Sequence, residues 1–168
     1  MDAWIGLGAN LGDRRATIEA AIGALGALPG TRVRARSRLW TSAPLDAGGP
    51  DYLNAVARLE TALGPRPLLV ALQGIESRFG RERPHRNAPR TLDLDLLLAG
   101  DAVLDLPEDA GGPALAVPHP RLHERAFVLR PMGDLDPDLA IPGRGTVRQW
   151  LPRVADQRCE PLPEPDPR

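Results

Sequence analysis

Asp93 and Asp95 stand two residues apart in the segment L-D-L-D-L-L at 92–97, with leucines at the alternate positions. In an extended strand, alternate side chains point to opposite faces, so the two carboxylates share one face. Two residues along a strand span roughly 6.5–7 Å. Carboxylates so spaced can bridge hard cations such as Mg²⁺, which keep coordination positions for substrate phosphate. A half-solvated antiparallel strand is the plain alternative, because it shows the same alternation.

Arginines and prolines come just before this segment, with Arg83, Arg86 and Arg90 lying among Pro84 and Pro89. Guanidinium groups bind phosphate with paired hydrogen bonds, and the prolines would stiffen the loop that carries them. With the two aspartates, this loop predicts a polyphosphate site that has metal on one side and guanidinium on the other. The composition alone does not name the reaction.

The composition restricts the class of protein. A length of 168 residues predicts one domain, over residues 1–158, followed by a disordered Pro-rich tail at 159–168. The 21 basic residues, all arginine, balance 22 acidic ones, which excludes lysine-dependent sites and disfavours a dedicated nucleic-acid binder. A single cysteine, Cys159, excludes an internal disulfide and a cysteine-cluster metal site. Met1-Asp2 leads straight into a structural segment and no apolar run is long enough to cross a membrane, so we expect a cytoplasmic protein. We also expect a monomer.

The hydrophobic periodicity predicts strands over 3–9, 31–40, 51–61 and 92–99. A helix should follow the first strand and stop at Pro29, and a second should run from about Pro65 to Gly80. A small hairpin or irregular excursion is expected over 102–117, a short helix over 122–129 and a weak one over 147–154. The order β-α-β-β-α-β is that of an α+β fold in which two helices pack on one face of an antiparallel sheet. The other face would then be free for ligands.

Several other patterns allow two interpretations. The glycines at 6, 8 and 12 are spaced one residue too widely for the dinucleotide-binding fingerprint and otherwise permit close backbone packing. The alternating arginines at 32, 34, 36 and 38 could meet phosphate or form a solvated face. Tyr52 and Asn54 share a strand face, which is either a cradle for a flat heterocycle or an ordinary sheet surface.

Two further sets of polar residues could contact a ligand. Gln73 and Glu76 lie off the apolar stripe of their helix, so they are either solvated or directed at a ligand. His119 stands between two prolines on irregular backbone, which favours a functional role over a place in the core.

Four stretches together resemble the 6-hydroxymethyl-7,8-dihydropterin pyrophosphokinase family of the folate pathway. They are I-G-L-G-A-N-L-G-D-R near the start, P-D-Y-L-N-A-V at 50–56, R-N-A-P-R-T-L-D-L-D-L-L at 86–97 and V-P-H-P-R-L-H-E-R-A-F-V-L at 117–129. The resemblance runs in order from about residue 3 to residue 150. It implies a ferredoxin-like fold with a C-terminal extension. It also implies transfer of pyrophosphate from ATP to the hydroxymethyl group of the pterin, with release of AMP.

The resemblance also implies roles for individual residues. Asp93 and Asp95 would hold two Mg²⁺ ions, and Arg81, Arg90 and Asp95 would be the catalytic groups. Phe127 and Tyr52 would sandwich the pterin, and Asn54 would hydrogen-bond it. The remaining pterin contacts implied are Ser42, Ala43, Leu45 and Asp95. The ATP contacts implied are Gln73, Glu76, Arg81, Arg83, Arg90, His119 and Arg125.

The chain departs from the family pattern at three places. Asn87-Ala88 stand where the family often has Trp-Gly, and the 81–90 loop is about a residue short, which affects how that loop would seal the site. Ser42-Ala43 replace Thr-Pro, a mild change because backbone atoms make the expected contacts. Pro120 cannot donate the side-chain hydrogen bond that a tyrosine could.

Two other classes of function stay open from the residues alone. An RNA-binding module on the same scaffold should show aromatic residues and a basic sheet face, which the arginine stripe matches only weakly. A dinucleotide-dependent oxidoreductase is disfavoured by the glycine spacing.

Overall fold

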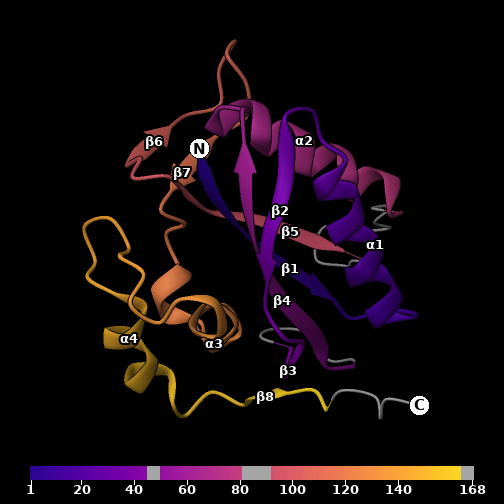
Figure 1. Ribbon diagram of the computed structural model, residues 1–168, viewed down its shortest axis with the longest axis vertical. Helices are drawn as coiled ribbons and strands as arrows, with labels where there is room; N and C mark the ends of the chain where they lie inside the picture. The colour runs from indigo at the N-terminus through magenta and orange to yellow at the C-terminus, as the bar shows by residue number, and fades with distance from the viewer. Residues whose placement is uncertain (45–49, 81–91, 164–168) are drawn as a thin grey trace.

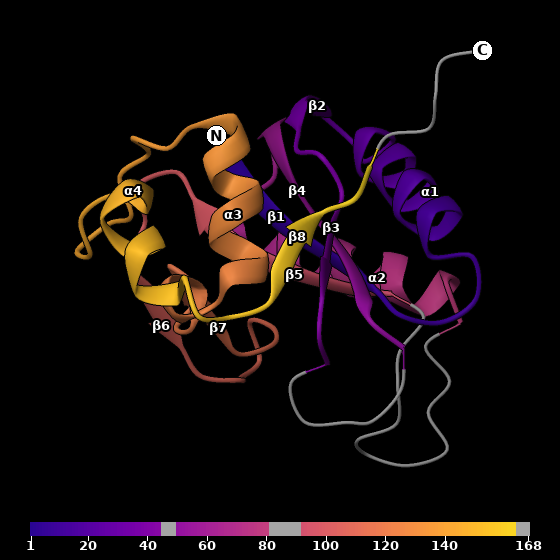
Figure 2. The same cartoon turned by 90° about the horizontal axis from the view of Figure 1, so that it is seen from below.

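The computed structural model describes residues 1–44, 50–80 and 92–163. Its centre is a six-stranded antiparallel sheet in the order β5-β1-β4-β3-β8, with β2 also paired to β4. The strands are β1 (Asp2–Ala9), β2 (Thr31–Arg36), β3 (Trp40–Ser42), β4 (Tyr52–Thr61), β5 (Asp93–Ala99) and β8 (Cys159–Pro161). Helices α1 (Arg14–Gly26) and α2 (Pro65–Arg78) lie on one side of the sheet, and α3 (Ala126–Leu135) and α4 (Val147–Trp150) lie on the other (Figures 1 and 2).

The two helices of the first face begin and end where the sequence predicts. The Asp13 carboxylate caps α1 by accepting a hydrogen bond from the Ala16 N–H at 3.0 Å. Pro65 occupies the first turn of α2, and Gly80, with φ of +77°, follows the helix. The expected order of strands and helices is therefore present up to β5.

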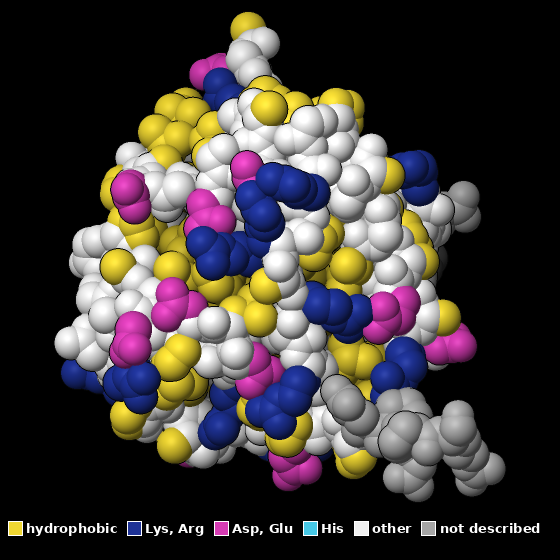
Figure 3. Space-filling model, in the orientation of Figure 1, with side chains coloured by type: hydrophobic (Ala, Val, Ile, Leu, Met, Phe, Trp, Pro, Cys, Tyr) yellow, Lys and Arg dark blue, Asp and Glu magenta, His cyan; other side chains and the backbone are white. Residues whose placement is uncertain are grey.

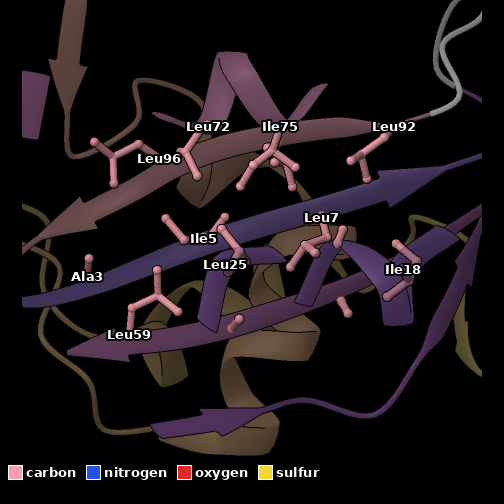
Figure 4. Packing of buried hydrophobic residues seen from close by; sticks show 14 of the residues in the cluster. Ala3, Ile5, Leu7, Ile18, Leu25, Leu59, Leu72, Ile75, Leu92 and Leu96 are labelled. Carbon is pink, nitrogen blue, oxygen red and sulfur yellow. The ribbon is translucent and has the colours of Figure 1, made fainter. Parts of the chain in front are cut away.

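Between this helix pair and the sheet lies the larger hydrophobic core (Figure 4). Ile5 and Leu7 of β1 and Leu94 and Leu96 of β5 pack in one cluster with Ile18 of α1 and Leu72 of α2. Each such buried side chain contributes about 1.5–3 kcal/mol relative to exposure. A slip of one residue in β5 would put its two aspartates into this core, so burial fixes the register of the strand.

A second core covers part of the opposite face. Trp4, Val56 and Leu97 project from three neighbouring strands and pack with Leu129 and Met132 of α3. The expectation that this face is free for ligands is therefore wrong for the part beneath α3. The expected short helix at 122–129 is also displaced, since a 3₁₀ turn at Leu122–Glu124 precedes α3 and the helix continues past Pro131.

The expected strand at 31–40 is broken into two. Both β2 and β3 pair with β4, but residues 37–39 between them leave the regular ladder. Ser37 explains the break because its N–H donates to the Val56 carbonyl and its Oγ accepts from the Val56 N–H, both at 2.9 Å. Val56 of β4 thus accepts one bond from Ser37 and donates another to its side chain, so the regular backbone ladder is interrupted there.

The arginine stripe is paired with carboxylates. Arg32 and Arg34 both reach Glu60, while Arg36 reaches Glu19 and Arg38 reaches Asp134. The molecular face in Figure 3 accordingly shows acidic side chains among the arginines. This pairing favours the solvated-face interpretation over a surface for RNA phosphate.

The remaining elements are a hairpin and the C-terminal segment. Strands β6 (Leu104–Leu106) and β7 (Leu115–Val117) form the excursion expected over 102–117. Helix α4 and the 3₁₀ turn Leu151–Val154 fill the expected weak helix at 147–154. The predicted disordered tail at 159–168 is wrong at its start, because Cys159–Pro161 form β8 and Cys159 is buried. None of the helices in the described ranges is long and apolar enough to span a bilayer.

Asp134 joins α3 to β3, and we predict that Asp134→Ala lowers the free energy of unfolding by about 2 kcal/mol. Its carboxylate, 14% exposed, accepts from the Trp40 Nε1–H and from Arg38 Nη2, each at 2.9 Å. Removing it leaves the indole N–H without that acceptor. Urea unfolding would measure the loss.

The matched control is Asp138→Ala, because Asp138 pairs with Arg148 at 2.9 Å but is 73% exposed. Its loss should leave the urea midpoint close to the wild-type value, as for other exposed pairs. Equal losses in the two variants would contradict the assignment.

Candidate functional site

Asp93 and Asp95 lie on the sheet face opposite α1 and α2, as their spacing predicts. Across β1, Gly8 is opposite Asp93 and Gly6 is opposite Asp95. Both aspartates are half-buried, whereas Leu94 between them is buried in the core. The positions of β1 opposite the two aspartates therefore carry no side chains, although the Leu97 side chain packs over Gly6.

The row continues onto β4, where Asn54 is opposite Gly8. A Cβ atom at position 8 would lie 3.5 Å from Asn54 Oδ1 and 3.6 Å from Tyr52 Cδ1. The glycine thus leaves open the space that borders both side chains. Tyr52 and Asn54 share a face with the two aspartates, which confirms the strand alternation expected for them.

Asn54 is held in one orientation although it is 3% exposed. Its Nδ2 donates to Ser42 Oγ at 2.7 Å and lies 3.5 Å from the Trp40 carbonyl oxygen. The amide oxygen therefore lies on the Gly8 side. A buried, oriented carboxamide with its acceptor beside an open strip can recognise the N–H groups of a flat heterocycle. Ser42 is buried in β3, and Ala43 follows it half-buried.

Phe127 and Arg125 come from the start of α3. The Arg125 guanidinium carbon lies 5.4 Å from the centre of the Phe127 ring, which is within range of a cation–π contact. Phe127 is half-buried and packs at the edge of the second core. Helix α3 contacts β3 and β4, so Phe127 stands at the start of a helix that packs on the sheet face carrying Tyr52 and Asn54.

His119 is fixed by its backbone on both sides. Its N–H donates to the Leu97 carbonyl of β5 at 2.9 Å, and its own carbonyl accepts from Arg144 Nη1 at 3.0 Å. Its Nδ1 accepts from the Arg121 N–H at 3.1 Å, so a neutral ring carries its hydrogen on Nε2. Sequence reasoning missed Arg144, because a bond from a side chain to a distant carbonyl leaves no local signal.

Burial lowers the pKa of His119 below its usual value. The positive charge of Arg125 lowers the pKa further, whereas the negative charge of Asp95 opposes the change. The ring is therefore neutral near pH 7, and its Nε2–H can donate to an oxygen acceptor.

Glu76 differs from its expected place off the apolar stripe. It is 5% exposed, and its Oε2 accepts from the backbone N–H of Leu94 at 3.0 Å. Because Leu94 lies between the two aspartates, this bond ties α2 to the part of β5 that carries them. Gln73, one turn earlier on α2, is half-buried.

Four residues that the sequence points to lie outside the described ranges: Leu45, Arg81, Arg83 and Arg90. Of the residues in those ranges, the fold brings Asp93, Asp95, Tyr52 and Asn54 onto one sheet face. Gly6 and Gly8 belong with them, although sequence reasoning assigned them no place in the site. Their signal was the same two-residue period that marks the aspartates.

The aspartate pair has the donor chemistry that Mg²⁺ requires. Within the described part of the chain, no group of three or more His, Cys, Asp or Glu residues is placed to hold a metal ion. Mg²⁺ usually binds one or two carboxylates, keeps several waters and takes substrate phosphates as further ligands. Two half-buried carboxylates on one face of β5 therefore fit this ion.

The family model of 7,8-dihydro-6-hydroxymethylpterin-pyrophosphokinase (HPPK) matches residues 4–137. The chain belongs to this family. The 2-amino-4-hydroxy-6-hydroxymethyldihydropteridine pyrophosphokinase of Pseudomonas aeruginosa is 45% identical over 161 residues, which cover 95% of this chain and 96% of the relative. The protein of the same name in Haemophilus influenzae is 37% identical over 157 residues, which cover 93% and 94%.

A solved structure supports the fold. The HPPK-DHPS of Plasmodium falciparum, as a triple mutant with SDX-DHP, superposes with a TM-score of 0.73 over 91% of this chain and 44% of that chain. At 14% identity, this match speaks for the fold, a mixed α+β arrangement with an antiparallel sheet.

We predict that Glu76→Ala lowers the free energy of unfolding by about 1–3 kcal/mol, because the buried Leu94 N–H loses its acceptor. Glu76→Gln should lose less than half as much, since its amide oxygen can still accept that bond. Urea unfolding of both variants would measure the difference. Equal losses would show that the charge matters and the Leu94 bond does not.

Proposed function

We propose that this protein transfers pyrophosphate from ATP to the hydroxymethyl group of 6-hydroxymethyl-7,8-dihydropterin, giving the pterin diphosphate and AMP in folate biosynthesis. Membership of the HPPK family supports the reaction. The observation that carries the assignment to this site is the row in which Asp93, Gly8 and Asn54 lie opposite one another on three strands. A carboxylate for the phosphate side and a carboxamide for the pterin side thus meet across one glycine.

The pterin would lie over Gly8. Its flat ring would stack between Tyr52 and Phe127, and Asn54 would bind its N–H groups. Ser42 supports this role because its hydroxyl accepts the Asn54 Nδ2–H and so orients the amide. Ala43 and Leu45 complete the proposed slot, with Asp95 at the end where the hydroxymethyl group would lie.

ATP would approach from the β5 side. The neutral His119 would donate its Nε2–H to an oxygen of the nucleotide, and Arg125 would bind phosphate from the start of α3. Glu76 would contribute by holding β5 through Leu94. The other proposed ATP contacts are Gln73, Arg81, Arg83 and Arg90.

Asp93 and Asp95 would hold two Mg²⁺ ions. Bound there, Mg²⁺ would neutralise charge on the phosphate oxygens. The residues themselves position the two substrates and surround the developing charge, which is most of what such a reaction requires.

In the reaction the hydroxymethyl oxygen forms a bond to the β-phosphorus in line with the leaving group. The bond from that phosphorus to the oxygen bridging to the α-phosphate breaks, AMP takes the electron pair, and the hydroxyl loses its proton. Arg81 and Arg90 would stabilise the charge on the transferring oxygens. Asp95 would assist loss of the hydroxyl proton.

The finer features of the protein are part of the same proposal. The sheet order β5-β1-β4-β2 with α1 and α2 on one face supports a ferredoxin-like core, which the segment from α3 onward extends. We propose a single domain that works as a cytoplasmic monomer and binds neither nucleic acid nor membrane.

Asp95→Ala should lower kcat at least about a hundredfold, because it removes a carboxylate from the metal and hydroxyl side of the site. AMP formation from ATP, measured with Mg²⁺ and hydroxymethyl pterin, tests this. Asp105→Ala, in the exposed hairpin strand β6, is the control and should keep its rate. A near-native rate for Asp95→Ala with unchanged Mg²⁺ dependence would contradict the metal assignment.

Phe127→Ala should weaken pterin binding about tenfold and ATP binding less, because stacking contributes about 0.5–1.5 kcal/mol beyond area burial. Equilibrium binding of each substrate would measure this. The control is Phe79→Ala, since Phe79 lies at the end of α2 and packs on the other core. Equal weakening of both substrates, or none, would count against the stacking role.

A further inference from the structure

The C-terminal strand β8 lies beside β3, where it completes the sheet next to the proposed pterin slot. Cys159 pairs with Ser42, and the Leu162 N–H donates to the Leu39 carbonyl at 2.8 Å just beyond the paired strands. These residues follow the part of the chain matched by the family model, which ends at residue 137.

Arg158, the residue before β8, binds Asp51 through two hydrogen bonds. Its Nη1 donates to Asp51 Oδ2 at 2.9 Å, and its Nη2 donates to Oδ1 at 2.8 Å. The guanidinium holds the pKa of Asp51 below its usual value, so the carboxylate stays charged near neutral pH. Arg14 adds a bond from Nη1 to the Asp51 backbone carbonyl at 2.7 Å.

Asp51 comes directly before Tyr52, and Tyr52 is opposite Ser42 in the β3–β4 ladder. Two consecutive residues of the C-terminal segment therefore hold both strands at this end of the sheet. Cys159 holds β3 through its backbone, and Arg158 holds the start of β4 through its side chain. These two contacts meet at Tyr52, whose aromatic ring is proposed to stack on the pterin.

We propose that Arg158 is a positioning residue for the pterin substrate, which acts through Asp51 to fix the place of the Tyr52 ring. This inference rests on the proposed function, because it needs Tyr52 to stack on the ligand. Stacking depends on the plane and offset of the ring, so a small displacement of the strand lowers affinity. The effect should fall on the pterin and not on ATP.

A purely structural role for Arg158 would give a different experimental result. Arg158 and Asp51 are 52% and 37% exposed, and exposed pairs contribute little to global stability. The Arg148–Asp138 pair provides a matched control, because it is also exposed and joined by two hydrogen bonds, but its arginine belongs to α4. If Arg158 only added stability, the two pairs would behave alike.

The test compares Arg158→Ala with Arg148→Ala in the full chain. In Arg158→Ala, the KM and equilibrium Kd for hydroxymethyl pterin should rise about three- to fivefold, the range expected for loss of one well-formed ion pair. The KM for ATP and kcat should stay within about twofold of the wild-type values. The urea midpoint should not change. Arg148→Ala should leave all of these values as in the wild type.

Two further variants separate the ion pair from the side chain alone. The exchange Asp51→Arg with Arg158→Asp should recover most of the pterin affinity, and Arg158→Lys should recover part of it, because an ammonium cannot form both bonds of the fork. An unchanged pterin Kd in Arg158→Ala would overturn the inference. So would equal losses for ATP and pterin accompanied by a lower urea midpoint.

The same experiment keeps this inference distinct from the proposed function. A wild-type protein that binds pterin and forms AMP supports the function, whatever Arg158→Ala does. A wild-type protein that binds no pterin would refute the function and the inference together. Binding without turnover would refute the reaction, and the Kd values would still decide the role of Arg158.

Discussion

Strand β5 must bury one face in the hydrophobic core and present the charged aspartates on the other, and the site depends on this constraint. Leu94 and Leu96 are buried beneath α2, and this burial sets which way the two aspartates point. Glu76 adds a buried bond to the strand between those aspartates. On the neighbouring strand, Gly8 leaves space beside Asn54 and Tyr52 that a larger side chain would fill, whereas Leu97 packs over Gly6. Hydrophobic burial and the shape of the charged face are thus two results of one alternating sequence.

Much of the fold follows from local patterns. The two-residue period of the strands, Pro65 at the start of α2 and Gly80 after its end all predicted elements that the structure contains. The failures have long-range causes. The break at Ser37 depends on its two bonds to Val56, the passage of α3 beyond Pro131 depends on packing against Trp4 and Leu97, and the strand at Cys159 depends on β3. None of these partners is near in sequence, so no local rule could find them.

In the candidate site too, local patterns predict some features and long-range contacts decide the others. The shared faces of Asp93 with Asp95 and of Tyr52 with Asn54 were predictable, because strand alternation alone decides them. The burial of Glu76 was not, since its charge argues for solvent until the Leu94 N–H is known to face it. The resemblance to a family supplied roles that residue types could not, such as the nucleotide side for His119. The geometry then adds reasons, including the tautomer that its neighbours impose on that histidine.

The position of β8 has a consequence for biosynthesis. In space β8 borders β3, yet 119 positions separate Thr41 from Glu160 along the chain. While the ribosome is still making the polypeptide, β3 therefore remains an uncovered sheet edge, and such edges readily pair with other chains. The nascent protein can bury its main core early, but it cannot close this edge until residues 159–161 have left the exit tunnel. A product terminated before β8 would keep most of the fold, but the edge of β3 would stay unpaired and able to bind other chains.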